Sequence, residues 1–228
     1  MTPWLRLLCL AFFVAPVPAL AQVPPSAAEI AAYRDLHAAA AKGDTAAIER
    51  LVKAGSPLDA RDSHKRTPLH VAGHLRRRDA AALLMKLGAD ANALDADKYD
   101  IVTIASVADD VPMLKVALAG GCKAGNMTSP YDGTALIAAA HLGHDEVVRV
   151  LIAAKAPLDH VNNLHWTALI ESIVLGDGGK RHTATLEALV KAGANLNLAD
   201  RNGNTPLTLA RGRGYTEMVA ILTAAGAR

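Results

Sequence analysis

Apolar and polar residues along this chain follow a helical period that starts again at nearly constant intervals. In the stretches 147–152 and 218–222, apolar side chains recur at i, i+3 and i+4, which puts them on one face of a helix. Each apolar stretch ends near a glycine and is followed by a turn rich in Asn and Asp. The pattern predicts short amphipathic helices joined by turns.

Two independent sets of marks give the length of the repeating unit. The first set consists of four-residue segments that begin at Arg34, Thr67, Asp100, Thr134, Thr167 and Thr205, spaced 33, 33, 34, 33 and 38 residues apart. The second set is Gly55, Gly88, Gly121, Lys155, Gly193 and Gly226, spaced 33, 33, 34, 38 and 33 residues apart. Both sets repeat at nearly the same interval, and both lengthen to 38 residues in the same part of the chain. The chain is therefore a tandem array of about 33-residue units.

The residues at the marks predict two helices in each unit. Thr67 and Thr205 suit a helix N-cap, and the proline after each stands at the first helical position, where no donor is lost. Gly43, Gly143 and Gly214 fall where the first helix should end, since a left-handed C-cap favours glycine. A unit this thin cannot bury its own apolar face, so neighbouring units must stack.

The first unit has its own start signal. Ser26 and Glu29 form a capping-box pattern that predicts a helix running into Leu36 and His37. No turn precedes it, which is typical of an N-terminal capping repeat. The last unit ends with the final residues of the chain, so six units are expected, two of them caps.

The segments Thr67-Pro68-Leu69-His70, Leu142-Gly143-His144-Asp145-Glu146-Val147-Val148 and Gly193-Ala194-Asn195-Leu196-Asn197 resemble the ankyrin-repeat family. The resemblance covers about residues 26–228. It implies an all-α solenoid of helix-turn-helix repeats with hairpin finger loops and a concave inner-helix face. The repeats are expected at about 26–61, 62–94, 95–126, 127–161, 162–199 and 200–228. The resemblance also implies protein–protein interaction without naming a partner, and no enzymatic activity.

The first 21 residues follow a different pattern. Arg6 precedes a wholly apolar run from Leu7 to Val14, and small residues at Ala19 and Ala21 suit signal peptidase. The apolar stretch is about 15 residues long, against the roughly 20 that span a bilayer, so cleavage after Ala21 is favoured over an uncleaved anchor. We therefore expect a signal peptide at 1–21, a repeat domain at 22–228 and no stable membrane insertion. A bacterial periplasm is the favoured compartment, with secretion as the alternative.

Composition changes once residues 1–21 are set aside. The remainder carries 23 Lys and Arg against 22 Asp and Glu, so its charge does not predict binding to nucleic acid. Cys122 is left as a single cysteine, expected to pack as a small apolar residue. Five aromatic residues remain: Tyr33, Tyr99, Tyr131, Trp166 and Tyr215.

Three of those aromatic residues fall in consecutive finger loops. Tyr99, Tyr131 and Trp166 each stand just before a first helix, in repeats 3, 4 and 5. Rigid aromatic side chains on loops are common binding anchors, so we expect a shared recognition ridge. The alternative is that each ring packs against the stem of its own loop. The expected polar rim is Asp97, Lys98, His160 and His165.

Repeat 5 carries two further departures. Five extra residues fall around 176–182, between its two helices, in a glycine-rich stretch that does not fit a phosphate-binding loop. Glu171 and Ser172 replace apolar or small residues of a first helix, and His141 is expected to face the same groove one repeat earlier. Glu171 and His141 are therefore candidates for a polar contact on the concave face, with plain solvent exposure as the alternative.

The competing hypothesis is a metal-dependent or enzymatic role for His141, Glu171, Asp177 and His182. Their spacing assembles no nucleophile, base and orienting group, so we expect no catalytic residue, cofactor or metal site. His37, His70 and His144 take the structural histidine positions that the resemblance implies. A homo-oligomer that uses the aromatic ridge is a further alternative, although the sequence does not indicate one.

Overall fold

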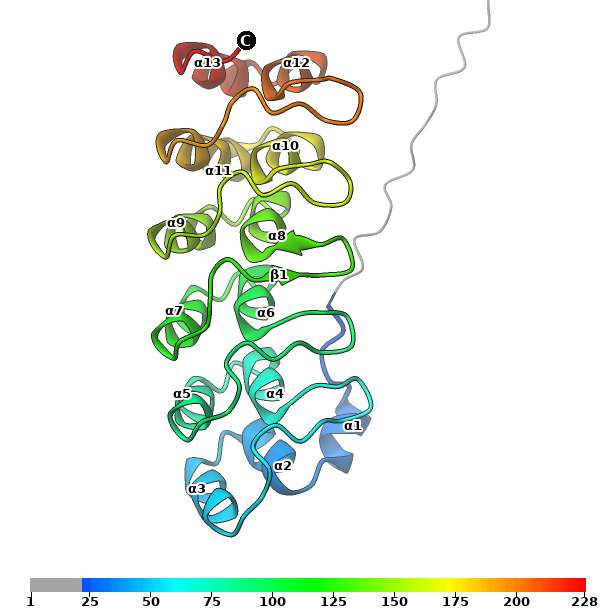
Figure 1. Cartoon of the computed structure of the whole chain (residues 1–228), viewed down its shortest axis with the longest axis vertical. Helices are drawn as coiled ribbons and strands as arrows, with labels where there is room; N and C mark the ends of the chain where they lie inside the picture. Colours follow the sequence, from blue (N-terminus) through cyan, green and yellow to red (C-terminus); the bar gives the residue numbers. More distant parts are fainter. Residues whose placement is uncertain (1–21) are drawn as a thin grey trace, which may run out of the picture.

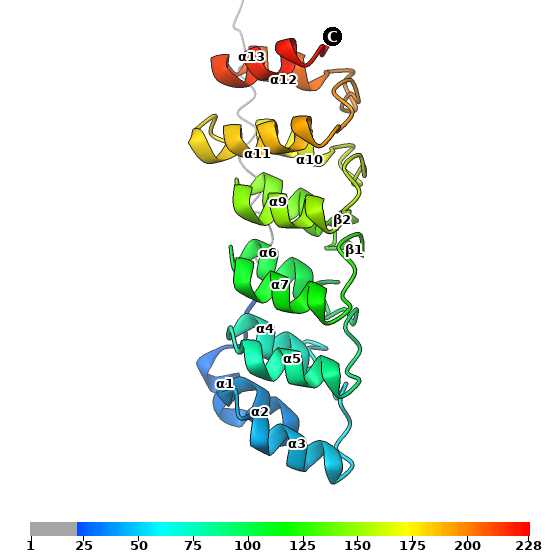
Figure 2. The ribbon, with the colours of Figure 1, turned by 90° about the vertical axis from the view of Figure 1, so that its left-hand side faces the viewer.

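The structure is a computed structural model and describes residues 22–228 (Figure 1). The expected signal peptide and its cleavage after Ala21 lie outside the described residues. Within residues 22–228 there are thirteen helices and one short β-hairpin. Twelve of the helices form six pairs that stack along one axis (Figures 1 and 2). The predicted all-α repeat solenoid is therefore confirmed.

Each pair contains a first, inner helix and a second, outer helix. The pairs are α2 (Asp35–Lys42) with α3 (Thr45–Lys53), α4 (Pro68–His74) with α5 (Arg78–Lys86), α6 (Ile101–Val107) with α7 (Val111–Ala119), α8 (Ala135–His141) with α9 (Asp145–Ala153), α10 (Ala168–Val174) with α11 (Lys180–Lys191), and α12 (Pro206–Gly212) with α13 (Thr216–Ala224). Inner helices pack on inner helices, and outer helices on outer helices. The long loops between pairs project to one side as the finger loops (Figure 1).

Local capping residues set where the helices begin and end. The side chains of Thr67 and Thr205 accept hydrogen bonds from the backbone amides three residues later, as predicted. Gly43, Gly143 and Gly214 have φ values of 74°, 66° and 70°, so they follow the first helix of repeats 1, 4 and 6 in the left-handed conformation expected of them.

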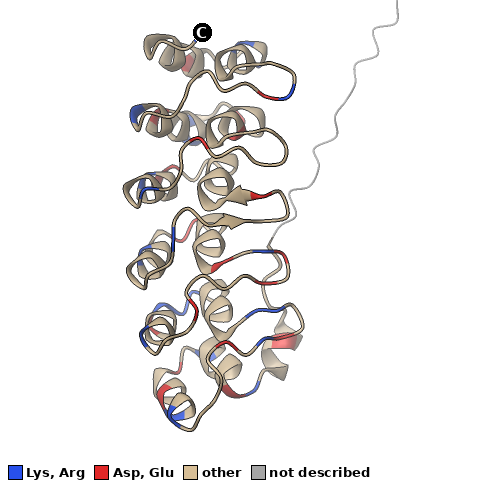
Figure 3. Ribbon diagram, in the orientation of Figure 1, with Lys and Arg blue, Asp and Glu red and all other residues tan. Residues whose placement is uncertain are grey.

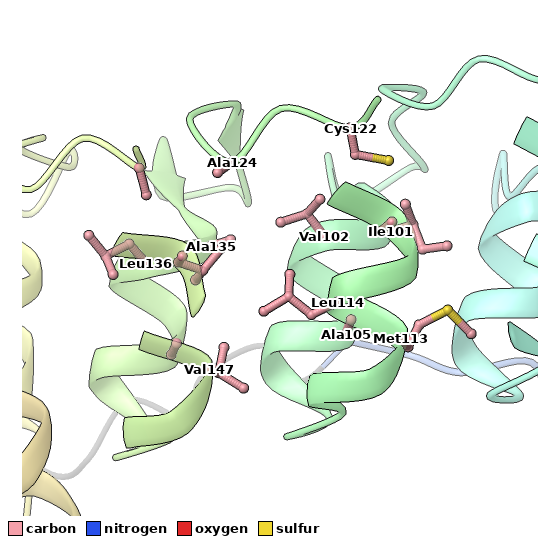
Figure 4. Close-up of a cluster of buried hydrophobic side chains, with 14 of the residues drawn as sticks. Ile101, Val102, Ala105, Met113, Leu114, Cys122, Ala124, Ala135, Leu136 and Val147 are labelled. Atoms are coloured by element: carbon pink, nitrogen blue, oxygen red, sulfur yellow. The ribbon is translucent and has the colours of Figure 1, made fainter. Parts of the chain in front are cut away.

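The core consists mainly of alanine and branched aliphatic side chains, and it runs through the whole stack. Between repeats 3 and 4, Val102 and Leu114 of one repeat face Ala135 and Val147 of the next (Figure 4). Cys122 is buried in this same cluster, as predicted, and burial raises the pKa of its thiol to about 12. Because each layer is thin, small and branched side chains fill the space between layers without large aromatic rings.

The N-terminal helix differs from its prediction. The Ser26–Glu29 capping box is present, but α1 (Ala27–Ala32) stops before Tyr33 instead of running into Leu36. Tyr33 and Arg34 are extended, and Asp35 has a φ of 47° at the start of α2. The single predicted helix is thus two helices with a sharp break. The cause lies outside the helical sequence, in contacts of α1 with the repeat-2 finger loop.

Only part of the repeat-5 insertion lies between the two helices, where all five extra residues were expected. The connector 175–179 has five residues where 142–144 has three, and α11 has 12 residues where α9 has 9. The five additional residues are therefore two in the connector and three in the helix. No helix within residues 22–228 combines the length and apolar character that crossing a membrane requires.

Candidate functional site

The five finger loops 62–66, 95–99, 129–133, 162–166 and 200–204 share one backbone frame. The first residue of each loop accepts hydrogen bonds from the backbone amides two and four residues later, at 2.8–3.4 Å. These first residues are Asp62, Asp95, Ser129, Asn162 and Asp200. Short polar side chains favour such local bonds in turns. The same frame therefore recurs on different sequences.

The frame decides which side chains reach the solvent. The fourth residue of each loop has a positive φ, and this turns the fifth residue back toward the stem. The residues at the fifth, stem position are Arg66, Tyr99, Gly133, Trp166 and Asn204. The residues at the third position, which we call the tip row, are His64, Asp97, Tyr131, Leu164 and Asn202. Tyr131 thus lies in a different row from Tyr99 and Trp166.

Hydrogen bonds join each finger loop to the next. The amide of Ala96 donates to the carbonyl of His64 at 2.9 Å, and the amide of Ser129 donates to that of Lys98 at 3.1 Å. The amide of Asn163 then donates to the carbonyl of Tyr131 at 3.0 Å. Arg201 completes the series with a 2.6 Å bond to the Asn163 carbonyl. The fingers form one continuous edge of the molecule, the finger edge.

The predicted site residues fall into three groups by exposure. Asp97, Lys98 and His165 are exposed on the finger edge; Tyr131, His141, His160 and Trp166 are half-buried; Tyr99 and Glu171 are buried. Lys98 also forms a 3.2 Å ion pair with Asp132 of the next loop, and the His160 Nε2 donates to the Asp132 carbonyl at 2.6 Å. These contacts join the rim residues Lys98 and His160 through Asp132.

Two of these residues cannot present their side chains as expected. Tyr99 is only 7% exposed, because the stem position directs its ring inward. The expectation of three projecting rings is therefore wrong at Tyr99. Glu171 is 3% exposed and belongs to the interior between repeats 4 and 5, so it offers no contact on the concave face.

Glu171 is part of a polar chain that links repeats 4 and 5. The side-chain amide of Asn162 donates to Glu171 Oε1 at 3.0 Å, and His141 Nδ1 lies 3.5 Å from Glu171 Oε2. Burial raises the pKa of Glu171 to about 7, while burial and then the charge of His182 lower the pKa of His141. Both shifts favour the uncharged forms, so compared with exposed side chains this buried pair is biased toward a protonated carboxyl beside a neutral imidazole.

His182 continues the chain to the repeat-5 connector. Its Nε2 donates to the His141 carbonyl at 3.0 Å, and its Nδ1 lies 2.8 Å from Asp177 Oδ1. The Gly179 amide and then His182 hold the pKa of the Asp177 carboxyl below its usual value. Both ring nitrogens of His182 are thus engaged by oxygen atoms. Within residues 22–228, no three His, Cys, Asp or Glu side chains are arranged to hold a metal ion.

The structural histidines are placed as the resemblance implied. His37 Nε2 and His70 Nε2 contact the carbonyls of Arg66 and Tyr99 at 2.9 and 3.0 Å. His144 Nδ1 contacts the Ser106 carbonyl at 2.8 Å. Each of these rings ties one repeat to its neighbour.

Sequence reasoning missed the apolar residues of the finger edge. Leu164 is 38% exposed in the tip row beside Tyr131, and Val161 and Met127 are 44% and 58% exposed nearby on the loops of repeats 5 and 4. The available signal was the loop register, since aligning the five first-position residues puts Leu164 opposite Tyr131. Charged residues of both signs are scattered over the repeats rather than gathered on one face (Figure 3).

Comparison with known proteins gives one consistent family. The family described as ankyrin repeats (3 copies) matches residues 33–95 and 102–200, and the family described as ankyrin repeats (many copies) matches residues 178–223. The ankyrin repeat protein YahD of Escherichia coli (strain K12) is 32% identical over 190 residues, which cover 83% of this chain and 94% of YahD.

Solved structures agree with this result. An ankyrin repeat domain from Acinetobacter baumannii AYE is 44% identical with a TM-score of 0.80, covering 85% of this chain and 98% of that domain. The ankyrin repeat domain of Bcl-3, a unique member of the IkappaB protein family, is 27% identical with a TM-score of 0.77, covering 86% of this chain and 87% of that domain.

Proposed function

The chain belongs to the ankyrin-repeat family, whose members generally act as protein-interaction scaffolds, and on that premise we propose that it is an exported scaffold that binds a protein partner. The binding surface is the finger edge of repeats 3 to 5 together with the adjoining part of the inner-helix face. The observation that carries this proposal is the tip row, in which Tyr131 and Leu164 stand side by side in register on neighbouring loops.

The energetics of this surface favour binding. The loop frame and the bonds between loops already fix the backbone, so little conformational freedom is lost when a partner docks. Tyr131 and Leu164 provide an apolar centre, to which the exposed Met127 and Val161 add surface. A small apolar centre inside a polar rim is the usual anatomy of a protein interface.

The polar rim comes from the predicted residues that stay accessible. Asp97, Lys98 and His165 are exposed beside the apolar centre, and His160 lies partly exposed below it. Charges in such positions affect the association rate and the choice of partner more than the affinity. His141, which is 29% exposed, marks the side of the inner-helix face next to repeat 5.

The competing metal-dependent or enzymatic role gains no support from the described side chains. Both ring nitrogens of His182 already contact oxygen atoms, those of Asp177 and of a backbone carbonyl. Glu171 is buried in contact with Asn162 and His141. No nucleophile joins them. The repeat-5 insertion instead serves packing, because its glycines make room for the rings of His182 and Tyr215.

Partner capture tests the binding proposal. Residues 22–228 immobilised on a resin should retain a protein from an extract of the source cells, and Tyr131→Ala with Leu164→Ala should weaken its affinity at least tenfold, or about 1.4 kcal/mol. The matched control is Leu142→Ala with Leu175→Ala, which removes two leucines of similar exposure (38% and 41%) from the connectors between paired helices. Equal loss in both variants would contradict the proposal.

Export has a separate test. The full chain expressed in a bacterium should be recovered outside the cytoplasm with Gln22 as its first residue by mass spectrometry. Recovery in the cytoplasm with Met1 retained would contradict export without affecting the binding proposal.

A further inference from the structure

Arg66 is the most unusual residue of the finger edge. It takes the stem position of the repeat-2 loop and is 1% exposed, although the other four loops carry no charge at that position. A buried guanidinium requires carboxylate partners. Asp62, the first residue of the same loop, provides one, at 2.7 Å from Nε.

The second carboxylate comes from outside the repeat. Glu29 of α1 accepts a short hydrogen bond from the Arg66 guanidinium, and the carbonyl of Val23 accepts another at 3.3 Å. The Tyr33 hydroxyl donates to Asp62 at 2.7 Å. The bonds from Ser26, supported by Arg66, hold the pKa of Glu29 at about 2, so it stays charged. The segment 23–33 thus lies against repeat 2 like a bound peptide.

This segment also covers part of the inner-helix face. Figures 1 and 2 show the chain from residue 22 passing α4 and α6 before it enters α1. Of the residues that stand four positions after an inner-helix N-cap in repeats 2 to 6, Val71, Ile104 and Glu171 are buried, whereas Ala138 and Leu209 are half-buried. Val71 and Ile104 are thus the buried apolar members of this set, and they belong to the repeats beside which residues 23–33 run.

The joint between α1 and α2 is held bent. Asp35 adopts a φ of 47°, a conformation that side chains with a Cβ rarely take, although nothing in the sequence from Ala27 to Lys42 breaks a helix. Beside the joint lies an open hollow of about 350 Å³, lined by residues that include Tyr33, Leu36 and Pro57. A straight helix from Ala27 to Lys42 would relieve Asp35, restore backbone hydrogen bonds across 33–37 and carry Glu29 away from Arg66.

We propose that the surface of repeat 2 around Arg66 and Asp62 that residues 23–33 contact, hereafter the groove, is a second protein-binding site. Helix α1 occupies this groove in cis and is released from it when α1 and α2 straighten into one helix. The partner that fits is a short protein segment with the chemistry of residues 23–33: a helical turn with a carboxylate for Arg66 and small apolar residues for Val71 and Ile104. This site is separate from the tip row of repeats 4 and 5.

The test uses residues 22–228 and a fluorescent peptide with the sequence of residues 23–33. Asp35→Val disfavours the positive φ and should open the groove, so the peptide should bind this variant at least tenfold more tightly than the unaltered chain, by fluorescence anisotropy. Asp35→Gly is the matched control, because glycine accepts the bent conformation and should keep binding at the unaltered level.

Three further readouts separate the outcomes. A peptide that carries Glu29→Gln should not show the tighter binding to the Asp35→Val chain. An Asp35→Val chain that also carries Arg66→Met should likewise bind the original peptide no more tightly than the unaltered chain does. In amide exchange, Asp35→Val should protect Leu36 and His37, which a straight helix bonds, whereas simple fraying of α1 would not.

The proposal is overturned if Asp35→Val and Asp35→Gly bind the peptide equally, or if the peptide without its carboxylate binds as well. Dimerisation of Asp35→Val in the absence of peptide would assign the groove to α1 of a second copy and overturn the choice of a foreign segment. The capture experiment with Tyr131→Ala and Leu164→Ala tests only the tip row. Its failure would not change the expected peptide binding at Arg66, so the two sites are tested independently.

Discussion

The two long edges of the solenoid are both joined from repeat to repeat, but they use their side chains differently. On the finger edge, backbone amides link three successive pairs of loops, and every tip-row residue stays at least partly exposed. On the opposite edge, formed by the connectors between paired helices, side chains make the links. Arg77, His144, His182 and Tyr215 donate to carbonyls of the preceding repeat at 2.8–3.0 Å.

The difference separates stability from recognition. A side chain that holds two repeats together is partly desolvated and not available to a partner, whereas a loop held by its backbone leaves its side chains free. Substitution of the linking side chains on the connector edge should therefore lower stability, whereas substitution in the tip row should change binding and leave stability nearly unaltered.

The largest expected effect is at Gly178 on the connector edge. A Cβ there would lie 2.5 Å from the ring of Tyr215, at a φ of 70°. Gly178→Ala should lower the free energy of unfolding by about 3 kcal/mol, from backbone strain and overpacking together. Gly203→Ala on a finger loop has a similar φ of 80° but no atom within 4 Å, so it should cost only about 1 kcal/mol. Urea denaturation measures both, and equal losses would remove the contrast between the edges.

The next effect concerns Glu171, between the two edges. Its folded pKa of about 7 lies above the ordinary glutamate value of 4.5, so its protonated form stabilises the fold at low pH and that stabilisation is lost as the pH rises through 7. Glu171→Gln should match the unaltered chain near pH 5 and exceed its stability by about 2 kcal/mol near pH 8. Because the two chains are compared at the same pH, the contribution of His141 protonation to their unfolding free energies is common to both and drops out of the difference. A stability difference that is the same at both pH values would contradict the assigned protonation.

The smallest effect is expected on the finger edge at Asn163. Its side chain donates to the Pro130 carbonyl at 3.2 Å, but the links to Tyr131 and Arg201 use its backbone and survive truncation. Asn163→Ala should therefore change the unfolding free energy by less than about 1 kcal/mol. A loss as large as that of Gly178→Ala would show that the fingers are held by side chains after all.

Periodic and local features of the fold could be predicted from the sequence. The repeat spacing, the caps at Thr67 and Thr205 and the turns at Gly43 and Gly143 depend on residues within one unit. Each of these caps and turns is determined by residues only a few positions apart, so it can be predicted from the sequence without knowledge of tertiary contacts.

The features that could not be predicted depend on contacts between distant residues. The break at Tyr33 accompanies the bonds of Tyr33 to Asp62 and of Glu29 to Arg66, and Glu171 is buried beside Asn162 and His141 of the previous repeat. Tyr99 and Tyr131 looked equivalent because both precede a first helix, but the loop frame puts one at the stem and the other at the tip.

The shared loop frame also bears on how such a protein can diverge. Its shape is set by the first residue of each loop and by the positive φ at the fourth, and the tip residue contributes to neither. Replacement at positions 64, 97, 131, 164 and 202 can therefore proceed one residue at a time without compensating changes in the helices. Relatives with this fold can acquire new specificities through mutations that are nearly neutral for folding.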